Sequence, residues 1–307
     1  MGEMAWNNVV DRVTIGALKG EGGTRASSCT VGGAKDLPFL RGATDPPKIA
    51  LEICDDPDTW SPIVLSYTGD VTQDPGGWAK KAEKGYGADL IRLYLNSTRK
   101  KGFSDVNGIK KTIVEVLENT GLPLIIEGSN EPAIDSEVFS ACGEAAAGEK
   151  VLLGTAEADR YRSVAAAALA YDHNVVAQSP IDINLAKQLN ILLHEIGIPH
   201  NRIVIDPFTG TLGYGFEYSY SVMERIRIAA LKGDFDLAMP MISSPVDSLN
   251  IKEVREAPEE VRDETAIMWE FCAAFSAAIA GAEIVCVRHP GTVQKLKASF
   301  SQLTRGA

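Results

Sequence analysis

The chain has 307 residues, of which 41 are Asp or Glu and 30 are Lys or Arg, so its formal net charge at pH 7 is −11. This acidic balance argues against nucleic-acid binding, because the chain would repel phosphates. No run of about 18 apolar residues indicates a membrane span, and Met1–Arg12 lacks the apolar core of a signal peptide, so we expect a cytoplasmic protein.

The first 47 residues predict a hairpin-like extension packed on the remainder of the chain. Two short strands are expected at Val13–Gly16 and Ser27–Gly33, and the glycine-rich segment Lys19–Thr24 joins them. We expect this hairpin to plug the N-terminal end of the domain that follows.

From Lys48 onward, short apolar runs alternate with longer amphipathic stretches. The predicted strands are Ile49–Ile53, Asp89–Leu95, Leu124–Ile126, Val151–Leu153, Asn174–Ala177, Ile203–Ile205, Phe235–Met239 and Ile284–Val287. The predicted helices are Gly77–Lys84, Ser104–Asn119, Pro132–Ala146, Ala158–Tyr171, Ile181–Ile196, Tyr218–Leu231, Glu264–Ala280 and Thr292–Leu303.

Strands that are apolar on both faces are typical of a parallel sheet covered by helices. Their number and spacing predict that residues 48–307 form a single (β/α)8 (TIM) barrel of the α/β class. A doubly wound open sheet is the alternative, but no GxGxxG turn follows Ile49–Ile53. The segment Ser243–Val261 is predicted to be a long, polar and irregular loop on the active face.

The functional site of a barrel lies at the carboxyl ends of its strands. Polar and conformationally special residues expected on this rim include Glu52, Asp55, Asp56, Asn96, Glu127 to Asn130, Gly154 to Glu157, Gln178 to Asn184, Asp206 to Gly210, Met239-Pro240 and Arg288 to Pro290. Arg288 and His289 either contact a ligand or partner or form a salt bridge across the rim. Gly210, Gly213 and Gly215 either let a bulky ligand approach the backbone or simply build a tight loop.

Few groups on the rim suit nucleophilic or metal chemistry. There is no GxSxG elbow, and His194 and His200 do not have HExxH spacing. Cys286 falls inside the last strand and is expected in the core. The cysteines, Cys29, Cys54, Cys142, Cys272 and Cys286, are scattered without CxxC spacing, so we expect no metal or iron–sulfur cluster in this chain.

The segment Ile203–Arg227 (IVIDPFTGTLGYGFEYSYSVMERIR) closely resembles the small (delta) subunit of the corrinoid iron–sulfur protein of the CO dehydrogenase/acetyl-CoA synthase system. Further similar motifs run from residue 22 to residue 290: Gly22–Arg25 with Val31–Gly33, Tyr86–Ile91, Ser179–Asn184 with Lys187–Leu192, and Arg288–Pro290. The strand followed by Asp-Pro is less specific, because pterin-binding barrels share it.

The resemblance implies a non-catalytic TIM-barrel subunit that pairs with a large (gamma) subunit. It implies a cobamide at the interface between the two subunits and a [4Fe–4S] cluster in the partner. The heterodimer would accept a methyl group from methyltetrahydrofolate through a methyltransferase and deliver it to acetyl-CoA synthase/CO dehydrogenase, in the reductive acetyl-CoA pathway of anaerobes.

The mouth of the barrel would cover the cobamide, and the residues expected on that surface are Asp206, Gly210, Tyr214, Gly215 and Arg288. Two other functions remain open. A pterin-binding methyltetrahydrofolate methyltransferase would need polar side chains converging inside the mouth, for which Asn96, Asp182, Asn184 and Asp206 are candidates. A purely structural scaffold subunit would contact no cofactor.

Overall fold

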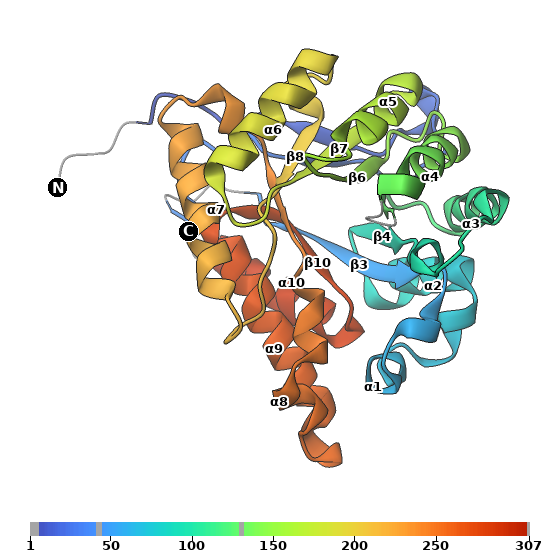
Figure 1. Cartoon of the computed structure of the whole chain (residues 1–307). Helices are drawn as coiled ribbons and strands as arrows, with labels where there is room; N and C mark the ends of the chain where they lie inside the picture. Colours follow the sequence, from blue (N-terminus) through green and yellow to red (C-terminus); the bar gives the residue numbers. More distant parts are fainter. Residues whose placement is uncertain (1–5, 41–44, 129–131, 306–307) are drawn as a thin grey trace.

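The computed structural model describes residues 6–40, 45–128 and 132–305. Eight parallel strands close into a barrel in the order β10-β3-β4-β5-β6-β7-β8-β9 (Figure 1). Their bounds are β3 Lys48–Cys54, β4 Leu90–Tyr94, β5 Leu124–Glu127, β6 Leu152–Ala156, β7 Asn174–Gln178, β8 Ile203–Asp206, β9 Met241–Ser243 and β10 Ala282–Val287. The predicted TIM barrel is confirmed, and the open sheet is excluded by the pairing of β10 with β3.

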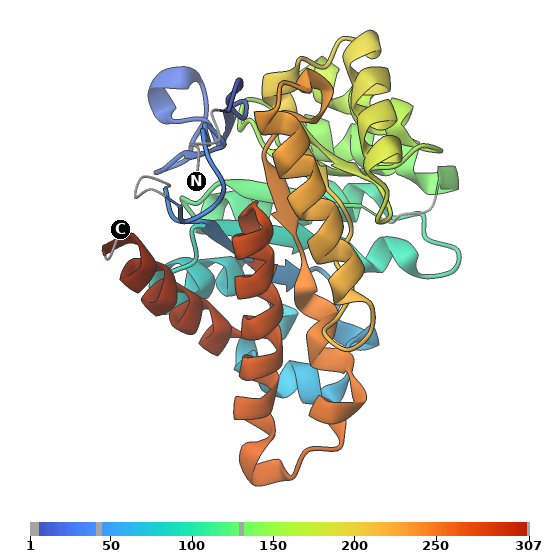
Figure 2. The same ribbon diagram turned by 90° about the vertical axis from the view of Figure 1, so that its left-hand side faces the viewer.

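The helices form the outer layer of the barrel. Their bounds are α1 Pro62–Ser66, α2 Pro75–Lys81, α3 Val106–Asn119, α4 Pro132–Ala145, α5 Tyr161–Tyr171, α6 Ile183–Ile196, α7 Phe216–Leu231, α8 Lys252–Arg255, α9 Glu259–Ala280 and α10 Pro290–Arg305. The segment with α8 and the start of α9 projects beyond the strands in both views (Figures 1 and 2). None of the helices in the described ranges has the length and hydrophobicity needed to span a bilayer.

The prediction of a strand at Phe235–Met239 is wrong. Residues Phe235–Leu237 form a 3-10 helix, and the seventh barrel strand is Met241–Ser243, so its carboxyl end is not at Met239-Pro240. Pro240 has no N–H for the ladder and contributes only its carbonyl, which accepts a hydrogen bond of 2.8 Å from the Ile205 amide. The strand therefore starts after the proline.

The segment Ser243–Val261 is also more ordered than predicted. It contains a 3-10 helix, η8 Pro245–Asn250, followed by α8, and the side chains of Leu249 and Val254 are buried. Its apolar residues Val246, Leu249, Ile251 and Val254 are buried within an otherwise polar stretch, so the segment is not irregular.

A two-stranded antiparallel sheet precedes the barrel, as predicted. It pairs β1 (Val13–Ile15) with β2 (Cys29–Val31). Their buried side chains pack against the inward-facing residues of the barrel strands, among them Leu90 and Ile284. Figure 2 shows this hairpin, in blue, at the end of the molecule opposite to α8. The division into an extension, 1–47, and a barrel, 48–307, stays a prediction, and residues 1–5 and 41–44 of the extension lie outside the described ranges.

Arg25, from the Gly22–Arg25 motif, ties the hairpin to the barrel. Its side chain is buried and forms an ion pair of 2.7 Å with Glu149. It also donates hydrogen bonds to the carbonyls of Leu117 (2.7 Å) and Thr120 (2.6 Å), at the carboxyl end of α3. These carbonyls have no partners within the helix, so Arg25 caps it.

Candidate functional site

Four charged side chains meet at the mouth of the barrel, where the strands end. Glu52 comes from β3, Arg92 from β4 and Glu127 from β5, and Arg288 follows β10 directly. All four are buried. Because β10, β3, β4 and β5 are consecutive around the barrel, these side chains are neighbours on its inner wall.

The four side chains form one ion-paired network. Arg92 donates Nη1 to Glu52 and Nη2 to Glu127. Arg288 donates Nε to Oε1 of Glu52 at 2.8 Å. Burial disfavours the ionised form of Glu52, but the guanidinium groups of Arg288 and Arg92 hold its pKa below the ordinary value. The network therefore keeps Glu52 ionised inside the barrel.

Arg288 is held from three sides. Its guanidinium lies 3.9 Å from the ring centre of Trp60, a distance typical of a cation–π contact. Its backbone N–H donates to Oε1 of Glu270 at 2.7 Å, and the N–H of His289 donates to Oε2 at 3.1 Å. The Nε2 atom of His289 lies 3.0 Å from Asp263. Within the described residues, the salt-bridge interpretation of Arg288 and His289 thus accounts for both side chains.

Asp206, the last residue of β8, supports the next loop. Its Oδ2 accepts a hydrogen bond of 2.8 Å from Gln178, and its Oδ1 accepts one of 2.8 Å from the amide of Phe208. Phe208 has a φ of +63°, which is rare for a bulky residue, and its side chain is 44% exposed. Asp206 therefore stabilises a strained turn that presents an aromatic ring to the outside.

Burial raises the pKa of Asp206 to about 6, against the lowering effect of the hydrogen bonds from Gln178 and Phe208. The native state therefore holds a proton that the unfolded chain releases at its ordinary pKa of 3.8. Stability from this group is fully present below pH 3.8 and is lost as the pH rises through about 6, by about 3 kcal/mol in all. Asp206→Asn should therefore weaken the fall in unfolding free energy between about pH 4 and pH 6.

This fall is measured by urea unfolding at several pH values. Burial raises the pKa of Glu270 to about 7, so Glu270 adds a change of the same sign that the Asp206→Asn variant retains. Asp70→Asn, at an exposed position, is the matched control and should keep the wild-type slope. An Asp206→Asn variant with the wild-type slope would contradict the assignment.

The β8–α7 loop carries the other three predicted site residues. A Cβ at Gly210 would lie 2.8 Å from the carbonyl carbon of Gly215, and Gly215 itself has a φ of +104°. Both glycines are thus needed for the loop to close on itself, which is the tight-loop interpretation. Tyr214 is 55% exposed, and its hydroxyl donates to Oε2 of Glu253 at 3.1 Å.

The predicted set is therefore divided between two places. Asp206 and Arg288 lie inside the mouth, whereas Gly210, Tyr214 and Gly215 form the loop at its rim. Contact of these five residues with a cofactor stays a prediction.

Three residues of the mouth were missed in the sequence: Arg92, Trp60 and Glu270. Arg92 stands in the apolar run Leu90–Leu95, and an arginine in a buried strand needs carboxylate partners, so it could have been linked to Glu52 and Glu127. Glu270 lies in the largely apolar part of α9 and carries a similar signal. The long loop after β3 gives no comparable signal for Trp60.

The four residues that could imitate a pterin site do not converge inside the mouth. Asn96 donates to the carbonyl of Asp56 at 2.6 Å. Asp182 caps α6 by accepting from the amides of Asn184 and Leu185, and Asn184 is exposed. Beside Asp206, the described residues leave a cavity of about 10 Å³, which is the space of about one water molecule. Ser129 and Asn130, also expected on the rim, lie outside the described residues.

The cysteines are free, and Cys286 is buried in the barrel interior as predicted. Burial raises the pKa of its thiol to about 12, so it is not a nucleophile at neutral pH. In the described ranges, no three His, Cys, Asp or Glu side chains are grouped so that they could hold a metal ion.

Known structures with a similar fold are dihydropteroate synthases. The enzyme of Xanthomonas albilineans, solved with 7,8-dihydropteroate, has a TM-score of 0.57 at 18% identity and covers 84% of this chain and 94% of its own. The Yersinia pestis enzyme, solved with a sulfonamide drug complex, has a TM-score of 0.60 at 15% identity and covers 87% and 98%. At this sequence identity, the structural similarity establishes the class of fold, a TIM barrel. It says nothing about the ligand.

Sequence comparison gives a narrower assignment. Residues 12–279 match the family described as CO dehydrogenase/acetyl-CoA synthase delta subunit. The acetyl-CoA decarbonylase/synthase complex subunit delta 1 of Methanosarcina thermophila is 35% identical over 95% of this chain and 70% of its own length. The subunit delta of Methanothermobacter thermautotrophicus is 37% identical over 92% and 74%. The chain belongs to the CO dehydrogenase/acetyl-CoA synthase delta subunit family.

Proposed function

We propose that this chain is the small subunit of a heterodimeric corrinoid iron–sulfur methyl carrier that works with an acetyl-CoA decarbonylase/synthase complex. In this proposal the large (gamma) subunit holds the cobamide and a [4Fe–4S] cluster. The methyl group comes from methyltetrahydrofolate through a separate methyltransferase and goes to acetyl-CoA synthase. The barrel itself carries no catalytic group and covers the cobamide with its mouth, in the cytoplasm of the cell.

The family membership supports the proposed association with an acetyl-CoA decarbonylase/synthase complex. The filled mouth of the barrel supports the proposal that the barrel covers the cobamide instead of enclosing it. A pterin needs a pocket within the barrel, whereas the ion pairs of Arg92 and Arg288 with Glu52 occupy this space. A large planar cofactor held by a partner needs only a surface across the mouth. The filled mouth therefore favours a covering role over a pterin-binding methyltransferase.

The rim offers groups that fit a corrin. Phe208 and Tyr214 are exposed on the β8–α7 loop, and their rings could lie against an apolar macrocycle. The Tyr214 hydroxyl, anchored on Glu253, is within reach of side-chain amides at the edge of such a ring. The cobamide would supply a nucleophilic cobalt centre for the methyl group. The contribution of the barrel would be to exclude water and oxidants from that face.

Tyr214→Ala is expected to speed cobamide loss from the reconstituted heterodimer and to lower the methyl-transfer rate. The substitution removes an exposed ring from the proposed cover, and its small cost in folding is set by the weak contact with Glu253. Cobamide retention after gel filtration and the rate of methyl transfer to and from the carrier, both under anoxic conditions, are the measurements.

The matched control is Phe235→Ala. Phe235 is 67% exposed in the turn between α7 and β9, away from the β8–α7 loop. This variant should behave as the wild type. If both variants retain the cobamide and transfer methyl groups at the wild-type rate, the barrel is a scaffold without cofactor contact. Binding of methyltetrahydrofolate by the isolated chain would instead favour the methyltransferase.

A further inference from the structure

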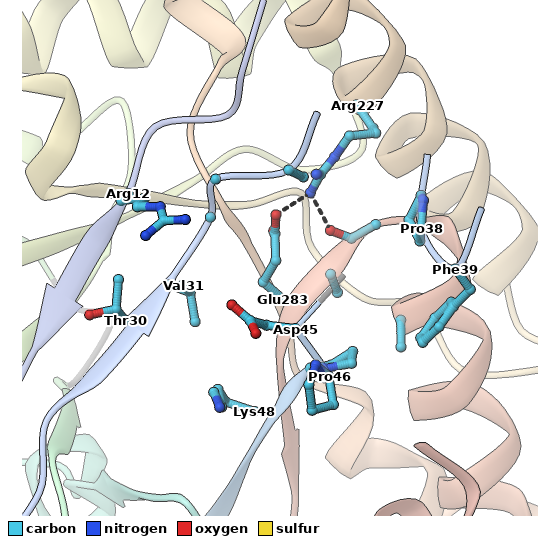
Figure 3. Close-up of a pocket in the computed structure, with 17 residues that line it drawn as sticks. Arg12, Thr30, Val31, Pro38, Phe39, Asp45, Pro46, Lys48, Arg227 and Glu283 are labelled. Atoms are coloured by element: carbon cyan, nitrogen blue, oxygen red, sulfur yellow. Dashed lines mark hydrogen bonds and ion pairs between the residues drawn. The ribbon is translucent and has the colours of Figure 1, made fainter. Parts of the chain in front are cut away.

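A second cavity lies at the opposite end of the barrel from the mouth. Its volume is about 250 Å³. The hairpin forms one wall, with Arg12 and Thr30, and the first residues of β3 and β10, Lys48 and Ala282, form another (Figure 3). Because the strands enter the barrel at this end, the cavity shares no residue with the ion-paired network of the mouth.

The charges in this cavity are only partly compensated. Arg227 forms an ion pair with Glu283 and donates to the carbonyl of Gly281 at 2.7 Å, so that pair is satisfied. Arg12, Lys48 and Asp45 also line the cavity, and none of the three has an ion-pair partner in the described ranges. Figure 3 shows the guanidinium of Arg12 directed from the hairpin toward the side where Asp45 and Glu283 lie. Arg12 and Asp45 are exposed and Lys48 is half-buried, so these two cations and one carboxylate are free to contact a ligand that enters the cavity.

The Val31–Gly33 motif builds the position of Arg12. A Cβ at Gly33 would lie 2.5 Å from Nε of Arg12, so the guanidinium lies across this glycine where any other side chain would displace it. The neighbouring Gly32 has a φ of +90°, and a Cβ there would come within 1.9 Å of the Asp11 carbonyl oxygen. Neither the fold of the mouth nor the proposed function accounts for this motif.

The remaining wall of the cavity is apolar. Pro38, Phe39 and Pro46 line it. The ring of Phe39 is stacked on Phe300 of α10, with 6.3 Å between their centres, which fixes its orientation. A flat, weakly polar group therefore has a surface to lie on, across the cavity from Arg12 (Figure 3).

We propose that this cavity binds a small organic phosphate with a flat ring, of the size of a nucleoside monophosphate. Arg12 and Lys48 bind the phosphate, since an arginine fork and a lysine are common partners of this dianion. The wall of Phe39 and the prolines contacts the ring. Asp45 accepts hydrogen bonds from hydroxyl or amino groups of the ligand, which a bare phosphate lacks. The site goes beyond the proposed methyl-carrier function and does not depend on it.

The test is calorimetric titration of the purified chain with AMP, adenosine and inorganic phosphate, with melting temperatures measured in parallel. We expect saturable binding of AMP and a rise of Tm with AMP concentration, because the ligand binds the folded chain only. Adenosine and inorganic phosphate should bind at least about tenfold more weakly, since each lacks one set of contacts.

Two variants test the site itself. Arg12→Gln removes one cation, and Gly33→Ala leaves every charge but displaces the guanidinium of Arg12; each should weaken AMP binding at least about tenfold. Arg225→Gln is the control, because Arg225 is exposed on α7 and does not line the cavity. Circular dichroism shows whether Gly33→Ala folds, and Arg12→Gln keeps the test decisive if it does not.

Three results would overturn the proposal. They are no saturable AMP binding, binding that Arg12→Gln leaves unchanged, and inorganic phosphate binding as tightly as AMP. The last would mean that the flat ring is not recognised. None of these results bears on the methyl-carrier function, which is tested at Tyr214.

Discussion

Glu52→Gln is expected to lower the free energy of unfolding by about 3–5 kcal/mol, the usual cost of removing one partner from a buried ion pair. Glu52 is 1% exposed and neutralises both Arg92 and Arg288. Without its charge, the two guanidinium groups repel each other in a medium of low polarity. Among the ion pairs of the described residues, Arg92 keeps the one with Glu127, whereas Arg288 loses the one with Glu52. We expect the Tm to fall by roughly 10 °C.

The matched control is Glu144→Gln. Glu144 forms an ion pair of 2.6 Å with Lys110, but both side chains are substantially exposed, so this change should cost at most about 1 kcal/mol. Urea unfolding of the wild type and both variants gives the comparison. Equal, small losses for the two variants would mean that the buried network does not stabilise the barrel.

Arg25→Ala is expected to cost a similar amount, about 3–5 kcal/mol, for a different reason. The change leaves Glu149 buried without its cation. It also removes the hydrogen bonds that Arg25 donates to the carbonyls of Leu117 and Thr120 at the end of α3. The hairpin should detach more often, because its contact with α3 is lost. We expect faster proteolysis within residues 13–31, together with the lower unfolding free energy.

Arg162→Ala serves as the control, because Arg162 is exposed and contacts only the ring face of Tyr161, at 5.3 Å, among the interactions described for it. This variant should unfold and be cleaved like the wild type. Rapid cleavage of the hairpin in both variants would show that Arg25 does not hold it.

The barrel could be predicted from the sequence because its strands are apolar on both faces and regularly spaced. The prediction of the seventh strand was wrong for a physical reason. Leu237 and Met239, which precede the strand, are buried by side-chain packing although they form no hydrogen-bonded ladder with a neighbouring strand. Periodicity reports burial, and it cannot separate a buried 3-10 turn from a buried strand.

The candidate site was less predictable. The carboxyl-end rule placed Glu52, Asp206 and Arg288 on the mouth, which the structure confirms. It could not give their partners, because an ion pair between β10 and β3 depends on barrel closure. It also could not show that Asp206 accepts hydrogen bonds from Gln178 and from the amide of Phe208, and the contact of Asp206 with a cofactor stays a prediction.

Closure of the barrel joins β3 to β10, strands separated by most of the chain. During synthesis β3 leaves the ribosome early, and its outer edge has no strand partner until β10 has been made. An unpaired, apolar edge is a template for association with other chains. Glu52 lies on β3 and Arg288 directly after β10, so their ion pair forms only when this seam closes. The ion pair between Arg288 and Glu52 can therefore form only after β10 has been synthesised and has covered the exposed edge of β3.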